Sequence, residues 1–261
     1  MIPESYIESL REQIPWQTLA MVEQDMVISR ALIDLYNHPK IQDSLIFRGG
    51  TALNKLIIAP PARYSEDIDF VQRKAEPIGE TINAIRSVLD GWLGDPKRKL
   101  TERSAKLVYQ YVGTNNLPSK LKVEINTTEH FQVLPTRLVS YSMDSDWFKG
   151  RCAIVTYELE ELLATKLRAL YQRRKGRDLF DLWFVFSRKL ADVNKVVKIF
   201  HEYCKNDAIL ITRDVFRNNM LQKHQNKDFQ VDMNVLLPYQ TQWNFDEAFN
   251  FVLNNVVNLI D

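Results

Sequence analysis

The sequence changes character near residue 158, and this change restricts the folds that the chain can adopt. Upstream of it, helical periodicity is interrupted by short apolar runs with strand-like alternation; downstream, nearly all of the sequence follows the 3.6-residue period of a helix. Strand candidates cover residues 45–47, 66–71, 106–112, 121–126 and 153–157. The sequence therefore predicts an α+β fold, in which a sheet-bearing lobe (residues 1–157) precedes a helical C-terminal lobe (residues 158–261).

The first lobe also contains helical stretches. Apolar residues recur at helical spacing over residues 4–37, where Pro15 indicates two helices, and the pattern ends at His38 and Pro39. Residues 51–58 and 78–93 are predicted to form two further helices. Since no Gly/Ser-rich linker separates the lobes, we expect them to pack together around a cleft that holds the ligand.

Composition excludes several classes of protein. The chain has 261 residues, 45% of them hydrophobic and 26% charged, as in ordinary globular proteins. Its net charge of +1 means that any binding of nucleic acid must depend on local patches. The two cysteines and four histidines show no metal-ligand spacing. No signal peptide is recognisable and no apolar stretch reaches the ~20 residues of a membrane span, so we expect a soluble, cytoplasmic protein.

Two aspartates stand out in the segment Ser65-Glu66-Asp67-Ile68-Asp69-Phe70. Side chains two apart on a strand share a face, so Asp67 and Asp69 would lie side by side and repel each other. A divalent cation relieves that repulsion, and Mg²⁺ prefers one or two carboxylates together with phosphate oxygens. The alternative is a solvated strand edge or a helix cap, because the motif alone has low specificity.

A pair of glycines precedes these aspartates. Phe47 and Arg48 lead into Gly49-Gly50-Thr51, so a buried strand enters a tight turn and then a helix, an arrangement that exposes backbone N–H groups to phosphate. Thr51 would add a hydroxyl or cap the helix. An ordinary strand–helix turn is the alternative. Ser65 is a further nucleotide-site candidate, either as a cap at the strand entry or as a regulatory hydroxyl.

A third carboxylate lies in the strand candidate over residues 120–126. Lys122, Glu124 and Asn126 face one way in the alternation, so a neighbouring strand could bring Glu124 beside the aspartates. Glu124 would then bind the metal or take a proton from an attacking hydroxyl. A cross-strand Lys–Glu pair explains the residue equally well.

In the helical lobe, Lys166 lies at the centre of an apolar stripe. A buried ammonium without a partner is costly, so Lys166 must extend to solvent, form an ion pair, or meet an anion such as a triphosphate. Asp178 and Asp181 stand one helical turn apart. They either stabilise a helix N-terminus or pair with Lys166 or Arg177 and orient that cation.

Basic residues are locally dense in two places. Next to a nucleotide site such patches could bind RNA phosphates, although they are usually only solvated faces. They comprise Lys97, Arg98, Lys99 and Arg103 in the first lobe and Arg168, Arg173, Arg174, Lys175 and Arg177 in the second.

In this order, the motifs resemble the AbiEii/AbiGii family of toxin nucleotidyltransferases, found in type IV-like toxin–antitoxin and phage-defence systems. The resemblance spans about residues 20 to 190 and rests on five segments: residues 47–53 (FRGGTAL), 63–70 (RYSEDIDF), 122–125 (KVEI), 161–170 (ELLATKLRAL) and 176–182 (GRDLFDL). Five motifs in sequence are far more specific than any one of them.

The resemblance implies a polymerase-β-like nucleotidyltransferase lobe with a small mixed sheet. It implies that Gly49, Gly50 and Thr51 hold the nucleotide phosphates, that Asp67 and Asp69 hold Mg²⁺ or Mn²⁺ with Glu124 as a less secure third ligand, that Lys166 contacts the triphosphate, and that Asp178 orients the site. The implied reaction transfers NMP from an NTP to the 3′ end of tRNA, which stops translation, and a cognate antitoxin is the implied partner. A small-molecule acceptor, a protein hydroxyl, or a nucleotide-binding module without turnover are the alternatives.

Overall fold

The computed structural model describes residues 2–11, 14–239, 241 and 243–261 and shows a mixed α/β fold. The chain divides into two compact units. The first unit comprises Met1–His130 and Thr136–Tyr157, and the second comprises Phe131–Pro135 and Glu158–Asp261.

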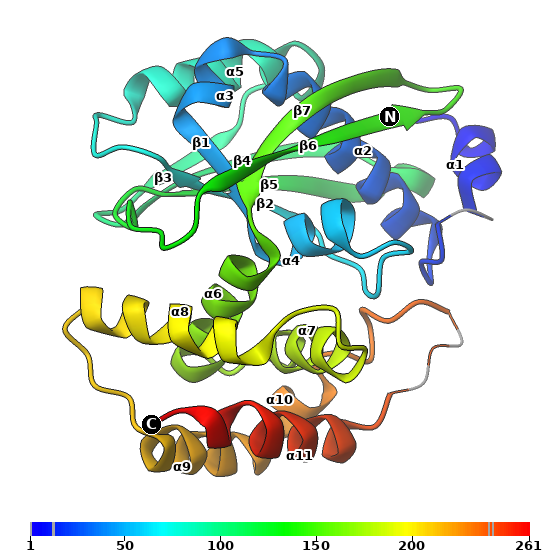
Figure 1. Cartoon of the computed structure of the whole chain (residues 1–261). Coiled ribbons are helices and arrows are strands. Elements are labelled where there is room, and N and C mark those ends of the chain that lie inside the picture. The colour runs from blue at the N-terminus through cyan, green and yellow to red at the C-terminus, as the bar shows by residue number, and fades with distance from the viewer. Residues whose placement is uncertain (1, 12–13, 240, 242) are drawn as a thin grey trace. The chain divides into compact units, whose positions relative to one another are not determined.

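The first unit is built on one mixed sheet of seven strands in the order β3-β4-β5-β2-β1-β7-β6 (Figure 1). The pairs β1–β7 and β2–β5 are parallel, and the other neighbours are antiparallel. The strands are β1 (Leu45–Arg48), β2 (Asp67–Gln72), β3 (Lys97–Leu100), β4 (Ser104–Val112), β5 (Pro118–Asn126), β6 (Thr136–Asp144) and β7 (Lys149–Tyr157).

The helices of this unit bury one face of the central strands. Helix α2 packs against β5 and β7, and α5 packs against β4 and α2 (Figure 1). Alternation then places Leu121, Val123 and Ile125 of β5 in the core and leaves the polar residues between them on the other face. The helices are α1 (Glu4–Arg11), α2 (Leu19–Tyr36), α3 (Pro39–Ser44), α4 (Gly49–Ala52), the π-helix η1 (Leu53–Ile57), α5 (Gly79–Leu93) and the 3₁₀ turn η2 (Thr114–Asn116).

The second unit is helical, as the sequence predicts. Its N-termini carry side-chain caps where Asp192, Thr212, Asn226 and Asn244 accept hydrogen bonds from backbone N–H groups. The buried carboxylate of Glu161 accepts the backbone N–H groups of residues 133 and 134, which fixes the short segment 131–135 to this unit. The helices are α6 (Leu159–Gln172), α7 (Gly176–Ser187), α8 (Val193–Asn206), α9 (Arg213–His224), α10 (Lys227–Val231), α11 (Phe245–Asn255) and the 3₁₀ turn η3 (Val257–Leu259).

Three elements differ from the predictions. Helix α3 begins at Pro39, where the helical pattern was expected to end, because proline at the first helical position needs no hydrogen-bond donor. Strands β3 and β6 were not expected, and the sheet is larger than the small sheet that the family resemblance implies. Among the described residues, no helix has both the length and the apolar character required to cross a bilayer.

Candidate active site

The sheet register brings the three predicted carboxylates together. In the parallel pair β2–β5, Asp69 lies opposite Glu124 and Asp67 lies opposite Lys122. On the other side of β2, Asp69 lies opposite Arg48 of β1. The acidic side chains therefore share one face of neighbouring strands, the face that helices α2 and α5 leave open.

Lysines neutralise part of this acidic cluster. Lys122 Nζ lies 2.8 Å from Asp67 Oδ2 and 3.4 Å from Glu124 Oε2. Lys106 Nζ, on β4, lies 2.8 Å from Glu124 Oε1. The cross-strand Lys–Glu pair considered for Glu124 is thus present, and it coexists with the position of Glu124 beside the aspartates.

The same surroundings shift two pKa values in opposite directions. Burial, with the negative charge of Asp67, raises the pKa of Asp69, and the cations Arg48 and Lys122 offset this only in part. Burial favours a higher pKa for Glu124 as well, but the ammonium groups of Lys106 and Lys122 outweigh burial, and the pKa of Glu124 is lowered. A cation beside Asp69 would therefore lower the cost of ionising this carboxylate.

Asp67 and Asp69 form a pair of carboxylates that suits a divalent cation. Within the described part of the chain, no group of three or more His, Cys, Asp or Glu side chains converges in metal-binding geometry. Lys122 and Lys106 hold the oxygens of Glu124. Mg²⁺ needs only one or two protein carboxylates when phosphate oxygens complete its shell, and Asp67 with Asp69 supplies these.

The Gly49-Gly50 turn lies directly against the carboxylate of Asp69. Gly49 follows the last residue of β1 and has a φ of +84°, a left-handed conformation that favours glycine. A Cβ atom at Gly49 would lie 2.8 Å from Asp69 Oδ2. A Cβ atom at Gly50 would collide with the buried guanidinium of Arg63. A Cβ atom at either glycine would therefore approach a neighbouring side chain too closely, that of Asp69 at Gly49 and that of Arg63 at Gly50.

Thr51 and Ser65 form a hydroxyl pair behind the turn. Their Oγ atoms lie 2.8 Å apart, and Thr51 Oγ1 donates to the backbone oxygen of Asp67 at 2.5 Å. The helix cap considered for Thr51 is wrong, because α4 begins at Gly49 and Thr51 lies inside it. The hydroxyl instead ties α4 to the start of β2.

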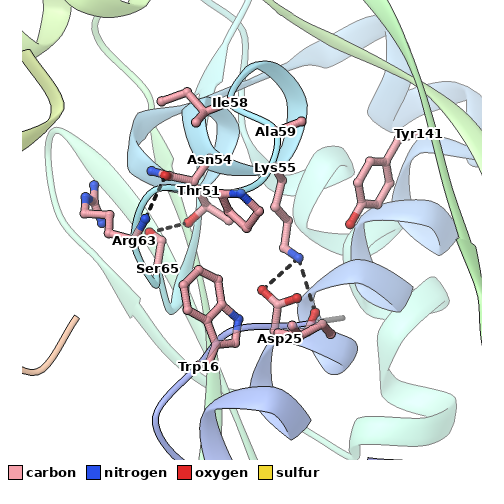
Figure 2. A pocket seen from close by; sticks show the side chains of 12 residues that line it. Trp16, Asp25, Thr51, Asn54, Lys55, Ile58, Ala59, Arg63, Ser65 and Tyr141 are labelled. Atoms are coloured by element: carbon pink, nitrogen blue, oxygen red, sulfur yellow. Dashed lines mark hydrogen bonds and ion pairs between the residues drawn. The ribbon is translucent and has the colours of Figure 1, made fainter. Parts of the chain in front are cut away.

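A pocket of about 240 Å³ opens beside this hydroxyl pair (Figure 2). Thr51 and Ser65 line it together with Lys55, whose ammonium lies 2.9 Å from Asp25 Oδ1. Trp16 forms an apolar wall, and its buried indole Nε1 has no hydrogen-bond partner among the described residues. A second, wider cavity of about 470 Å³ borders Asp67.

In the second unit, Lys166 is buried in an ion-pair cluster. Its Nζ lies 3.1 Å from Asp178 Oδ1 and 3.0 Å from Asp181 Oδ2. Arg173 Nε lies 2.7 Å from Asp178 Oδ2. The alternative that Lys166 extends to solvent is wrong, since the side chain is only 6% exposed. The ion pair, another of the alternatives, is present.

Asp178 takes its partners from α6 and the turn after it. The second partner is Arg173, whereas Arg177, considered from the sequence, uses its backbone N–H to donate to Asp232. Burial would raise the pKa of Asp178, but Lys166 and Arg173 outweigh it and lower the pKa to about 2. The carboxylate is therefore ionised at neutral pH and holds Lys166 in place.

Sequence reasoning missed several members of the carboxylate cluster. Arg48 and Arg63 appear in the motifs, but no sequence pattern shows that one lies opposite Asp69 and the other behind Gly50. Lys122 shares the alternation of Glu124, which was a usable signal. Lys106 carries no such signal, because its contact depends on the register of β4 with β5.

Comparisons with known proteins identify the family of the chain. The family model described as "Nucleotidyl transferase AbiEii toxin, Type IV TA system" matches residues 30–251. No protein with a curated description matches the sequence significantly. Among solved structures, MenT4, a nucleotidyltransferase toxin from Mycobacterium tuberculosis H37Rv, is similar with a TM-score of 0.67 and 16% identity, over 100% of this chain and 91% of that one. JHP933 from Helicobacter pylori is similar with a TM-score of 0.54 and 17% identity, over 91% of this chain and 90% of that one.

Proposed function

We propose that this chain, which belongs to the AbiEii family of nucleotidyltransferase toxins, transfers NMP from an NTP to RNA, specifically to the 3′ acceptor end of tRNA. The observation that carries the proposal is the contact between the Gly49 turn and the carboxylate of Asp69. It puts backbone donors suited to phosphate next to carboxylates suited to a metal ion.

In the proposed reaction, the 3′ hydroxyl oxygen of the acceptor attacks the α-phosphorus of the NTP, and the hydroxyl proton passes to solvent water. The bond between the α-phosphorus and the bridging oxygen breaks, and pyrophosphate leaves. Mg²⁺ or Mn²⁺ bound by Asp67 and Asp69 would neutralise developing charge on the attacking and leaving oxygens. The backbone N–H groups of the turn at Gly49-Gly50 orient the β- and γ-phosphates, and the hydrogen-bonded hydroxyls of Thr51 and Ser65 hold that turn against β2.

Glu124 has a more restricted part in this scheme. Its lowered pKa makes it a weak proton acceptor, and Lys106 and Lys122 hold both its oxygens, so Glu124 orients these lysines rather than acting as general base. The roles of Lys166 in contacting the triphosphate and of Asp178 in orienting the site are what the family resemblance implies. The cluster in the second unit shows how Asp178 holds the ammonium.

The direct test incubates the protein with each of the four α-³²P-labelled NTPs, Mg²⁺ and total RNA, and then separates RNA, protein and small molecules. We expect label in the tRNA fraction, removal of the label by 3′ exonuclease, and loss of transfer when EDTA replaces Mg²⁺. Asp67→Asn and Asp69→Asn should each reduce transfer by at least about 10²-fold, as loss of a transition-state electrostatic contact does.

The alternatives correspond to different outcomes of the same experiment. Label confined to a small-molecule fraction, or to protein, would replace RNA by that class of acceptor while leaving the site intact. Tight NTP binding without any transfer would identify a nucleotide-binding module. Transfer to RNA that survives both aspartate substitutions would overturn the site.

A further inference from the structure

Two rows of side chains cross the sheet from the carboxylates to its edge. Cross-strand pairing defines one row as Asp69–Glu124–Lys106–Lys99 and the other as Asp67–Lys122–Val108–Lys97. Each row begins on β2 with a candidate catalytic aspartate and ends on the edge strand β3 with a lysine. At about 4.8 Å per strand, the three steps cover about 14 Å.

All the members of these rows occupy one face of the sheet, because directly paired residues point to the same side. The lysines at the end of the rows, Lys97 and Lys99, are exposed, and Lys106 and Lys122 are about one-third exposed. Arg98 lies between Lys97 and Lys99 and pairs with Leu107, whose side chain is buried on the opposite face. The basic run found in the sequence is therefore divided between two faces.

Positive charge is in excess where the two rows reach the edge strand β3. Lys106 and Lys122 contact carboxylates, whereas Lys97 and Lys99 form no ion pair with the described residues. Lys99 stands directly opposite Lys106, and like charges in that position destabilise a sheet. An anion placed across Lys99 and Lys106 would remove this repulsion.

We propose that this face, defined by Lys97, Lys99, Lys106 and Lys122, binds the phosphates of the polynucleotide acceptor and leads its 3′ end to Asp67 and Asp69. The inference rests on the proposed function and adds the surface that recognises the acceptor. A length of about 14 Å exceeds the size of a single phosphate group, so the face accommodates more than one phosphate of a strand. A small acceptor with one phosphate would not require it.

The test is the binding of a 5′-fluorescein-labelled single-stranded RNA, measured by fluorescence anisotropy without NTP between 0.05 and 0.3 M KCl. The variants are Lys97→Gln, Lys99→Gln and their combination. Arg98→Gln is the matched control, since it removes one positive charge from the same exposed strand but from the other face. Thermal unfolding of each variant checks that the fold is retained.

We expect each lysine substitution to weaken RNA binding about fivefold at 0.1 M salt and to reduce the slope of log K against log salt by about 0.7, the value for one lost phosphate contact with a single strand. Arg98→Gln should leave both quantities unchanged. Equal effects of all three single substitutions, or no effect of the lysine substitutions, would overturn the proposal.

Steady-state transfer separates this inference from the proposed function. If both hold, the lysine variants raise the KM for RNA and leave the KM for NTP unchanged. If RNA is labelled but its KM does not respond to the lysines, only the surface assignment fails. If the wild-type protein labels no RNA, the proposed function fails, whatever the anisotropy shows. Polyglutamate that binds in a lysine-dependent way, while RNA does not bind, would reassign the face to an acidic protein partner.

Discussion

The environment of Asp69 suits a catalytic group but lowers the stability of the folded protein. Burial and the charge of Asp67 raise its pKa, so ionised Asp69 disfavours the metal-free folded state. The carboxyl group contributes fully to stability below its ordinary pKa of 3.8, and this contribution is lost as the pH rises through the higher folded-state pKa. A perturbed pKa of this kind is typical of catalytic groups.

Asp69→Asn should therefore stabilise the metal-free protein at pH 7, although it abolishes transfer. The amide keeps the shape of the side chain and removes the charge. In urea unfolding with EDTA present, the gain should be clear at pH 7 and vanish below about pH 4, where the wild-type carboxyl group is itself protonated. A variant less stable than the wild type at pH 7 would show that the attraction between the positive charge of Arg48 and the carboxylate outweighs the cost of burial.

Gly49 should tolerate no side chain. Alanine there would adopt a φ of +84° and bring a Cβ atom to 2.8 Å from Asp69 Oδ2. We expect Gly49→Ala to lower the free energy of unfolding by about 1–2 kcal/mol, the cost of a left-handed residue that is not glycine, and to reduce transfer by at least about tenfold through displacement of Asp69. Gly91→Ala, in helix α5 with open space around its Cα, is the control and should leave transfer unchanged.

At the residue scale, alternation in the sequence was enough to place Asp67 and Asp69 on one face of a strand. The sequence could not indicate that Lys122 contacts Asp67, or that Lys106 contacts Glu124, because these contacts depend on how distant strands pair. Strand register is fixed by burial of a whole face, which no single residue reveals.

Between elements, the ion-pair cluster joins helices α6 and α7 inside the second unit. Lys166→Met removes the ammonium shared by Asp178 and Asp181, and we expect it to cost about 3–5 kcal/mol of unfolding free energy, as the breaking of a buried pair does. Arg168→Met on the same helix breaks the less buried contact with Asp207 and should cost about 1 kcal/mol or less. Urea unfolding at pH 7 measures both.

The pH dependence of the wild type provides a second measurement on this cluster. The pKa of Asp178, about 2, is below its ordinary value of 3.8, so its contribution to stability is present above pH 3.8 and is lost as the pH falls toward 2. Lys166→Met should reduce this acid-induced loss. If the two proteins lost equal stability between pH 4 and pH 2, Lys166 would not be the cation that holds Asp178 ionised.

The elements that sequence patterns failed to predict have a common physical cause. The edge strands β3 and β6 are largely exposed on both faces, so they lack the apolar alternation by which strands are recognised. Charged edge strands also protect a sheet from pairing with other chains. The buried strands β1, β2 and β5, which carry the candidate site, were all predicted, because one face of each must supply the core.

At the scale of the whole molecule, the fold is similar to that of MenT4 although most of the sequence differs. The chain shares only 16% identity with MenT4, yet all of it aligns with that structure at a TM-score of 0.67. Many sequences can satisfy one hydrophobic pattern. The close contacts at Gly49, Gly50 and Asp69 permit far fewer substitutions, which explains why short motifs indicated the family when overall similarity is low.

Membership of a toxin–antitoxin family leads to a prediction in cells. Expression of the chain in a bacterial host without an antitoxin should arrest growth, because under the proposed function the modified acceptor ends of tRNA cannot be aminoacylated. Asp69→Ala and Lys166→Ala should each restore growth to the rate of an empty vector.

Asp95→Ala is the matched control: it removes an 85% exposed carboxylate that pairs with Arg86, and it should remain toxic. Immunoblots must show similar soluble levels of the Asp69 and Asp95 variants. Because Lys166→Ala is expected to be destabilised, its result counts only where its soluble level matches the others. Arrest that persists with Asp69→Ala at wild-type levels would mean that toxicity does not come from nucleotidyl transfer at this site.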